Sequence, residues 1–586
     1  MLKIFLMRSS VLPGILPIVF ILSVANLAAQ DVEAILNSDP LKVNGQLSFD
    51  KELNNQFIDS IKFKDQYSLF LSGRFNAKIY SIDFPFQFSY TNQQEDFSHP
   101  FSYNQFGTQP FYKGIKLYLG YNSLTFSPHT LSGHQFCGAG VEVAPKHLPF
   151  RGTVLYGRLV KPVEYDSAAF TLPAYDRRFY SYELGYTTEK YSITTSGLYA
   201  WDRSASVDVF PDSLGVYPKE NFALSLKGNY QITSRWSVNF DYGRSLFTEN
   251  ANSALLQEPT GNFLIKQRKT TRAFNAYGGQ VKYSLKKTSF GVQYKYVEPG
   301  YETLGAYYTN NDLEQISLVN TSRFLEGKLN LNVNLGLERD NLANDNMMTN
   351  RRFAGSLSIS AVPTEKISLN GSYSSFQSFS NLRSNFDYIN NNDPLELMDT
   401  LNYRQVNQSV SLSGSYSNQG EQATYSTALS LSGNTSGNSQ TEAGGSTVLI
   451  NSTLSQSVVF TESKLSLSAS LFGSLVQSTS NQLTFGPVIS LGKPFIKDML
   501  RTSLQAGINQ TWNDTTRLSF NANIRAMASI SLKESHLIAL TGTFYTTRDY
   551  LSNNLLENLQ IRLSYSYRIQ NTLIRRKSIS HDKTVR

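Results

Sequence analysis

The residues best suited to chemistry lie close together between positions 127 and 147. Three histidines share this stretch with two serines, a carboxylate and the sole cysteine: His129, His134, His147, Ser127, Ser132, Glu142 and Cys137. These types suggest a metal site or a nucleophile activated by histidine. The spacing matches neither a His-Glu-x-x-His site nor a recognised nucleophile motif. We therefore predict no catalytic residue, no metal and no cofactor. An esterase or protease that gathers Ser, His and acids from separate strands is the enzymatic alternative.

Two Asn- and Asp-rich segments could offer oxygen ligands to calcium. They read "DNLANDN" at 340–346 and "NNNDPLELMD" at 390–399, and neither has the EF-hand spacing. Ordinary turn chemistry is the alternative for both. The "GAG" at 138–140 lacks the strand and helix that flank a nucleotide loop.

The elements that carry these residues are two-faced strands. In "KLNLNVNLGLERDN", Leu329 and every second residue to Leu337 are apolar, and the residues between are Asn or Gly. The same period of two appears in "LQIRLSYSYRIQ" at 559–570 and in many segments between. A helix would mix these two faces, so the pattern predicts β-strands.

The alternation continues for more than 500 of the 586 residues without linkers that would divide a string of soluble sandwiches. Tyr, Phe or Trp stand near many strand ends, as in membrane strands with aromatic girdles. We predict an all-β fold, a single transmembrane antiparallel β-barrel of about 24 strands (22–26), with long extracellular loops and short periplasmic turns. Three apparent strands between Ile115 and Val160 are expected to fill two places, with part of "SPHTLSGHQFCGAG" folded inward or irregular.

The N-terminus has the features of a secretory signal peptide. Lys3 and Arg8 precede an apolar stretch, and small residues stand at Ala28 and Ala29. We divide the chain into a signal peptide (1–29), a short periplasmic segment (30–40), the barrel (41–570) and a basic periplasmic tail (571–586). A retained anchor is the alternative for the first segment, although two prolines interrupt it. Cys137 is too deep in the chain to be a lipoprotein cysteine, and no internal disulfide can form.

The formal charge of +8 is concentrated at the two ends of the chain. The signal peptide holds two of these charges and the tail a net four, which leaves two for the body. A nucleic-acid partner is therefore not expected, because the body has no concentrated basic surface for phosphates.

If the apolar face meets lipid, the polar face lines the lumen. Eight basic residues are candidates for this lining: Arg74, Lys78, Lys116, Lys227, Lys282, Lys295, Arg562 and Arg568. Against Asp83, Glu183 and Asp241 they predict a mildly positive wall that favours anionic solutes. The alternative is that folded-in loops or solvent neutralise them.

A barrel of this size encloses more space than its wall side chains can fill. We expect no separate plug domain, because about ten residues separate the cleavage site from the first strand. The segments 93–114 and 379–400 are aromatic-rich candidates for an internal obstruction, with ordinary extracellular loops as the alternative.

The chain resembles the large, functionally uncharacterised outer-membrane β-barrel proteins of Bacteroidetes-type bacteria. The resemblance rests on "NLAAQD", "LKVNGQLSF", "YNQFGTQPFYKGIKLYLGYNSLTFSPHTLSGHQFCGAGVEVAP" and "NNNDPLELMDTLNYRQVNQSVSLSGSYS", and it covers the mature chain. It implies a barrel in the bacterial outer membrane but transfers no functional residues. Without a plug or a TonB-contacting segment, energised import is not expected.

Two functions are consistent with these features. The first is porin-like passage of solutes through the lumen, with loops as candidate gates. The second is a plugged scaffold barrel that binds surface lipoproteins or secretion and assembly partners, for which the basic tail is a further candidate contact. Outer-membrane lipid is a partner in both.

Overall fold

The computed structural model describes residues 41–58, 61–80, 82–92, 104–167, 171–211, 214–256, 266–343, 351–379, 404–438, 446–533 and 535–574. The proposed signal peptide, the segment 30–40 and the tail beyond 574 lie outside the described residues. Two short 3-10 turns, η3 (Ser204–Ser206) and η5 (Leu325–Gly327), accompany the strands. In the described part of the chain, no helix has the length and apolar character needed to cross a membrane.

The strands follow one another along the described chain with few other elements. The first part contains β1 (Leu41–Ile58), β2 (Ile61–Ile79), β3 (Ile82–Thr91), β4 (Gln105–Thr108), β5 (Phe111–Tyr112), β6 (Ile115–Thr125), β7 (Ser132–Val143), β8 (Phe150–Val160) and β9 (Asp176–Thr187). The middle contains β10 (Tyr191–Arg203), β11 (Glu220–Gln231), β12 (Trp236–Thr248), β13 (Thr271–Ser284), β14 (Thr288–Val297), β15 (Leu313–Phe324), β16 (Leu329–Arg339), β17 (Arg351–Thr364) and β18 (Ile367–Phe379). The last part contains β19 (Arg404–Gln419), β20 (Ala423–Asn438), β21 (Ser446–Phe460), β22 (Ser466–Gln477), β23 (Asn481–Phe495), β24 (Leu500–Asn513), β25 (Thr516–Leu532), β26 (His536–Asp549) and β27 (Leu555–Ile574).

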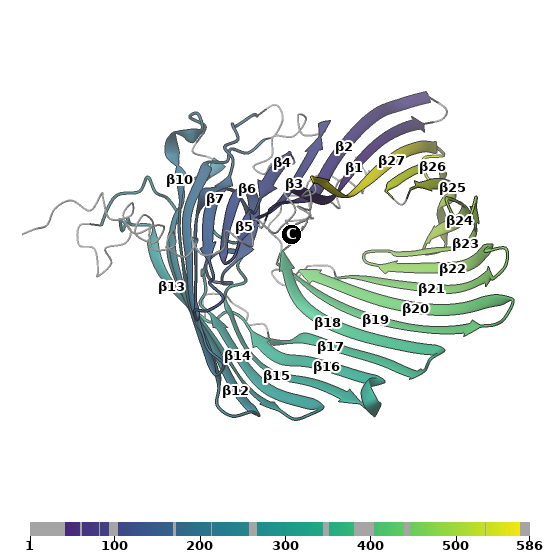
Figure 1. Ribbon diagram of the computed structural model, residues 1–586. Coiled ribbons are helices and arrows are strands. Elements are labelled where there is room, and N and C mark those ends of the chain that lie inside the picture. Colours follow the sequence, from purple (N-terminus) through teal and green to yellow (C-terminus); the bar gives the residue numbers. More distant parts are fainter. Residues whose placement is uncertain are drawn as a thin grey trace, which may run out of the picture.

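These strands form one closed antiparallel sheet. Each strand pairs with its neighbour in the chain, except that β4 and β5 each pair with β3 and β6 instead of with one another. The strand β1 also pairs with β27, where Leu53 lies opposite Ile561. Figure 1 shows the strands in sequence around the ring, with β1 beside both β2 and β27. Closure leaves no open edge, so the backbone groups of the wall are paired within the sheet.

The wall has 26 strand positions, because β4 and β5 together fill one interrupted place between β3 and β6. The predicted fold class is confirmed, and 26 lies at the upper end of the predicted range. The expectation that the segment from Ile115 to Val160 fills only two places is wrong, because β6, β7 and β8 all join the wall. Gly138 on β7 explains the close packing there: a Cβ at this position would lie 2.2 Å from the carbonyl oxygen of Tyr156. Gly138 stands on the inner face of β7, whereas the outward residues Ala139 and Val141 keep the period of two.

The connections differ in length between the two ends of the barrel. Long connections, such as 161–175, 204–219 and 298–312, all leave one end, which we call the long-loop end. Short turns such as 188–190 and 285–287 lie at the opposite, short-turn end, where β1 begins and β27 ends. This contrast matches the predicted alternation of loops and turns.

Alternate side chains of each strand point to opposite faces. On β8, Val154 and Tyr156 are 52% and 43% exposed on the outer face, whereas Thr153 and Leu155 are fully buried on the inner face. On β11, Leu226 and Tyr230 are exposed outside, whereas Ser225 is buried inside. The buried apolar residues therefore form a core within the barrel, against one part of its inner wall.

Candidate functional site

A short stretch between β6 and β7 folds into the barrel and lies on its inner wall. This inner segment, Phe126–Leu131, closes as a tight turn in which the Phe126 N–H donates to the Leu131 carbonyl at 2.8 Å. Its side chains reach several strands: the hydroxyls of Ser127 and Ser225 lie 2.8 Å apart, as do those of Thr130 and Ser196. The expectation that part of this region folds inward is confirmed for these residues.

Small residues on the wall make room for the inner segment. Gly243 on β12 is the clearest case, because an added Cβ would lie 2.5 Å from both Cβ and Cγ of His129. The ring of His129 reaches past this glycine to Asp241, whose Oδ2 lies 2.9 Å from Nε2. Gly278 plays the same part for Asp241, since a Cβ there would lie 2.7 Å from its carboxylate.

A second stretch covers the inner segment from the long-loop end. This covering segment, Tyr301–Gly305, belongs to the connection between β14 and β15. The hydroxyl of Tyr301 donates to the His129 carbonyl at 3.0 Å, and that of Thr303 donates to the Thr130 carbonyl at 2.9 Å. Burial raises the pKa of the Tyr301 phenol, so the phenol keeps the proton that it donates.

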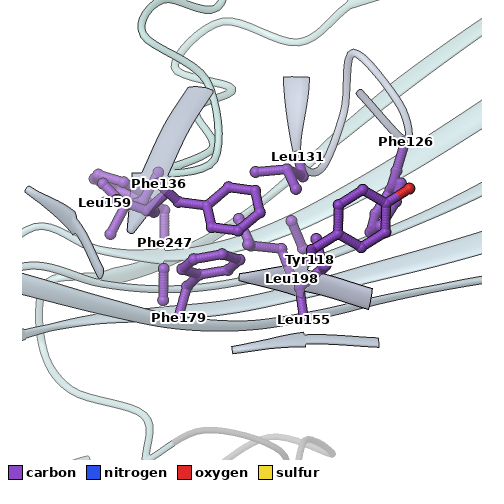
Figure 2. Packing of buried hydrophobic residues seen from close by; sticks show 12 residues of the cluster. Tyr118, Phe126, Leu131, Phe136, Leu155, Leu159, Phe179, Leu198 and Phe247 are labelled. Carbon is purple, nitrogen blue, oxygen red and sulfur yellow. The ribbon is translucent and has the colours of Figure 1, made fainter. Parts of the chain in front are cut away.

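An apolar core lies beneath these contacts (Figure 2). Phe126 and Leu131 of the inner segment pack with wall residues such as Leu155 and Leu198, and Phe136 meets Phe179 edge-on at 5.2 Å. Burying one side chain of this size contributes about 1.5–3 kcal/mol. The inner segment is therefore a fixed part of the wall.

Six ionisable side chains of alternating sign follow one another around the inner face of β7 to β14. We call this set the charged band: Glu142, Arg151, Glu183, Lys227, Asp241 and Lys295. Nε of Arg151 lies 3.3 Å from Glu142, and its terminal nitrogen lies 3.9 Å from Glu183.

Lys227 continues the band toward the inner segment. It is directly opposite Asp241 in the ladder between β11 and β12, and it interacts electrostatically with Glu183 as well. Its ammonium donates to the Phe126 carbonyl at 2.5 Å. Lys295 on β14 is a further electrostatic neighbour of Asp241. The band can therefore meet a solute with both positive and negative groups.

The structure places three of the eight basic candidates in this region. Lys227 and Lys295 belong to the band, and Lys116 lies opposite Glu142 with its ammonium 4.8 Å from the ring centre of Tyr118. These three share the band region, whereas the other five are distributed elsewhere around the wall.

Those five occupy other strands. Arg74 is opposite Gln46, Lys78 is opposite Asp83, and Lys282 is opposite Ser237. Arg562 forms an ion pair with Asp50 at 3.1 Å, and Arg568 is opposite Gln46 across the seam of β1 and β27. Their part in solute passage stays a prediction.

Sequence reasoning missed Arg151, and it named Glu142 only as a neighbour of the histidines and not as a residue that lines the lumen. The alternation of Arg151 with the outward-facing Phe150 was a usable signal, but the uncertain strand count between Ile115 and Val160 concealed it. With these residues included, the band has three acids and three bases, and Lys116 beside it adds a fourth base. The preference for anionic solutes stays a prediction.

The histidines that suggested chemistry are not brought together with one another. His129 pairs with Asp241, whereas His134 lies 2.7 Å from its neighbour's carbonyl and stacks on Tyr307 at 4.2 Å. His147 is exposed in the turn after β7 at the short-turn end. Across the described ranges, no group of three or more His, Cys, Asp or Glu could hold a metal ion.

The two proposed calcium segments are only partly described. In the first, the amides of Asn341 and Leu342 donate to the Asp312 carboxylate at 3.1 and 2.9 Å, which is turn chemistry. The second lies outside the described residues, as does most of the candidate obstruction 379–400. In the other candidate obstruction, residues 93–103 are likewise outside, and the remainder includes β4 and β5 of the wall.

No family model matches the chain, and no curated protein matches it. Among solved structures, it is similar to the translocation pore of the P pilus usher PapC, with 11% identity, a TM-score of 0.39, and coverage of 90% of this chain and 100% of that chain. It is also similar to OccK7 (OpdD) of Pseudomonas aeruginosa, with 9% identity, a TM-score of 0.30 and coverage of 90% and 99%. A third similar structure is OccAB3 of Acinetobacter baumannii, with 12% identity, a TM-score of 0.28, and coverage of 65% of this chain and 99% of that chain. These similarities are distant, so function is argued below from the residues of this chain. The resemblance to Bacteroidetes-type barrels stays a prediction.

Proposed function

We propose that this chain is an integral β-barrel of the bacterial outer membrane and that it passes small water-soluble solutes through its lumen. The observation that carries the proposal is the two-faced wall of a closed 26-position barrel. Its outer face is apolar, and its inner face is polar and carries the charged band.

Support for a membrane location comes from two aromatic groups on the outer face. Near the long-loop end, Tyr180 stacks with Tyr156 at 4.7 Å and with Trp201 at 5.5 Å. At the short-turn end, Trp236 packs on Tyr283 at 4.8 Å. Such girdles mark the two interfaces of a membrane barrel.

The spacing of these groups fits a bilayer. Tyr191 at the short-turn end and Trp201 near the long-loop end stand ten residues apart on β10. Ten residues of strand span about 33 Å, or about 23 Å along the membrane normal at a tilt of ~45°. Membrane barrels carry an apolar band of about 25 Å.

Passage through the lumen is supported by the size of the barrel and by the position of its core. Barrels of 16 to 18 strands already leave an aqueous channel. In the described part of the chain, the inner and covering segments pack against the wall of β6 to β15. The charged band lies beside them and is the part of the wall that we expect to select among ions.

The test is single-channel conductance of the purified full-length protein in a planar bilayer. We expect large, steady current steps, because the inner segment is fastened to the wall and should not open and close. Insertion is checked separately by protection of the barrel from protease in sealed vesicles. A protein that inserts and remains silent would contradict solute passage and would support the scaffold function, with partner proteins sought by co-purification from native membranes.

A further inference from the structure

The outer face of the last strands carries a hollow. One row of paired residues crosses five strands, from Leu491 through Leu504, Ala526 and Gly542 to Ile561. The two small residues stand between larger ones, and Ala528 extends the low area toward the short-turn end. The result is a cavity of about 570 Å³ that opens on the outer face.

The surroundings of Gly542 show that this space is open. A Cβ built on Gly542 has no heavy atom within 4 Å, whereas most glycines of the barrel contact a neighbour at that distance. The flanking Leu504 and Leu540 are 49% and 50% exposed. The hollow therefore presents apolar surface that no described side chain fills, in a size range suited to a small ligand.

A cation stands at one end of the hollow. Lys493 lies on the outer face of β23, directly opposite Thr502, and both line the cavity. Its ammonium is 5.4 Å from the ring centre of Phe495, the last residue of the strand, so it points toward the short-turn end. Lys497 is exposed in the following turn, where the acid Asp498 is paired with Lys464.

We propose that this hollow binds one glycerophospholipid with an anionic headgroup. An acyl chain lies along Ala526, Ala528 and Gly542, and the net negative headgroup meets the ammonium of Lys493, which would repel the quaternary ammonium of a zwitterionic choline headgroup. A lysine near the end of a membrane strand extends its charge to the headgroup level, where basic residues attract anionic lipid. This inference rests on the proposed membrane location, in which short turns face the periplasm and the lipid comes from the inner leaflet.

The position of the charge distinguishes lipid from other occupants. Three polar residues line the hollow: Lys493 at one end, Thr502, whose hydroxyl donates to the Lys493 carbonyl at 3.2 Å, and Ser503, which alternates with the outward Thr502 and Leu504 on β24; the remaining lining is apolar or glycine. A lipid has this same division between a long apolar part and one terminal anion. A second copy of this chain would bring its own apolar outer face, which resembles the lining of the hollow but does not match the cation at its end.

The test is native mass spectrometry of the full-length protein in neutral detergent, titrated with dimyristoyl phosphatidylglycerol or dimyristoyl phosphatidylcholine. We expect one retained phosphatidylglycerol, with about fivefold weaker retention in Lys493→Gln, since a basic residue near an anionic membrane surface contributes about that factor. Lys493→Arg should retain the lipid. Gly542→Leu should abolish retention by filling the hollow.

Gly433→Leu is the matched control, because Gly433 on β20 also has no atom within 4 Å of an added Cβ. Equal retention by Gly542→Leu and Gly433→Leu would overturn the proposal, as would equal retention of the two lipids. A mass of two chains that disappears only in Gly542→Leu would assign the hollow to a second copy instead. Bilayer conductance of the same samples separates the two proposals. Normal conductance together with equal retention of the two lipids overturns only the lipid site. Failure of the protein to insert overturns both the lipid site and the proposed function.

Discussion

Replacing Lys227 by Gln should shift the ion selectivity of the pore toward cations. Lys227 stands between Glu183 and Asp241 in the charged band, so its loss leaves two acids next to each other. A unit charge acting on an ion about 8 Å away through water contributes about 0.5 kcal/mol. Removing the positive charge lowers the energy of a cation in the pore and raises that of an anion. Salt at 0.1 M screens this electrostatic effect over about 10 Å. The cation-to-anion permeability ratio should therefore rise about twofold to fivefold.

The assay is the reversal potential of the channel in a bilayer with a potassium chloride gradient. Glu183→Gln should move the reversal potential in the opposite direction, because it leaves Arg151 and Lys227 with less acid between them. Lys227→Arg keeps the charge and should match the unmodified protein. Lys51→Gln is the outer-face control, since Lys51 lies 5.2 Å from the ring centre of Tyr67 on the opposite face of the wall.

Two results would refute this reasoning. If Lys227→Gln and Glu183→Gln shift the potential in the same direction, the shift comes from movement of the inner segment rather than from charge. If neither shifts it while conductance is normal, ions pass elsewhere in the lumen and the charged band does not select them.

Other variants test the packing that holds the site and the membrane position of the barrel. Gly243→Ala should destabilise the protein by about 1–3 kcal/mol in urea titrations in detergent, because its Cβ would meet His129 at 2.5 Å. Gly279→Ala, whose Cβ has a nearest atom at 3.4 Å, should change stability little, and equal effects of the two would show that the inner segment is not clamped. Trp236→Ala should weaken folding into lipid vesicles by at least the ~0.5–1.5 kcal/mol of its ring pair with Tyr283, while Trp236→Tyr should restore most of it. If Trp236→Ala folded into lipid vesicles as well as the unmodified protein, the aromatic girdle at the short-turn end would be contradicted.

The wall of the barrel was predictable from local sequence, because apolar and polar residues alternate over about ten residues of each strand. The stretch from Leu329 to Leu337 did so without ambiguity, and β16 covers it in the structure. The strand β7 did so less clearly, because its inner face carries Phe136, Gly138 and Gly140 where polar residues are expected. Three strands were apparent between Ile115 and Val160, and the error was to assign them only two places in the wall.

The inner segment was predictable only as a place where the pattern breaks. Its partners come from distant parts of the chain: His129 and Asp241 are 112 residues apart, and Tyr301 is 172 residues from the carbonyl that it binds. A period of two carries no information about such contacts. The histidines and serines of 127–147 looked like a site because polar residues interrupt an apolar pattern, and the structure uses Ser127, His129 and Thr130 to fasten a turn to the wall.

The electrostatic character of the wall could not be obtained by counting charges on predicted inner faces. A count assigns each basic residue equal weight. The structure instead places Arg151 between Glu142 and Glu183, and it places Lys227 between Glu183 and Asp241. Such pairing converts a net charge into a sequence of opposite charges along the wall. A solute then responds to the spacing of the charges as well as to their sum, because the field of closely paired charges falls off faster than that of a single charge. We therefore expect selectivity for dipolar solutes over simple anions from this arrangement, which composition alone does not predict.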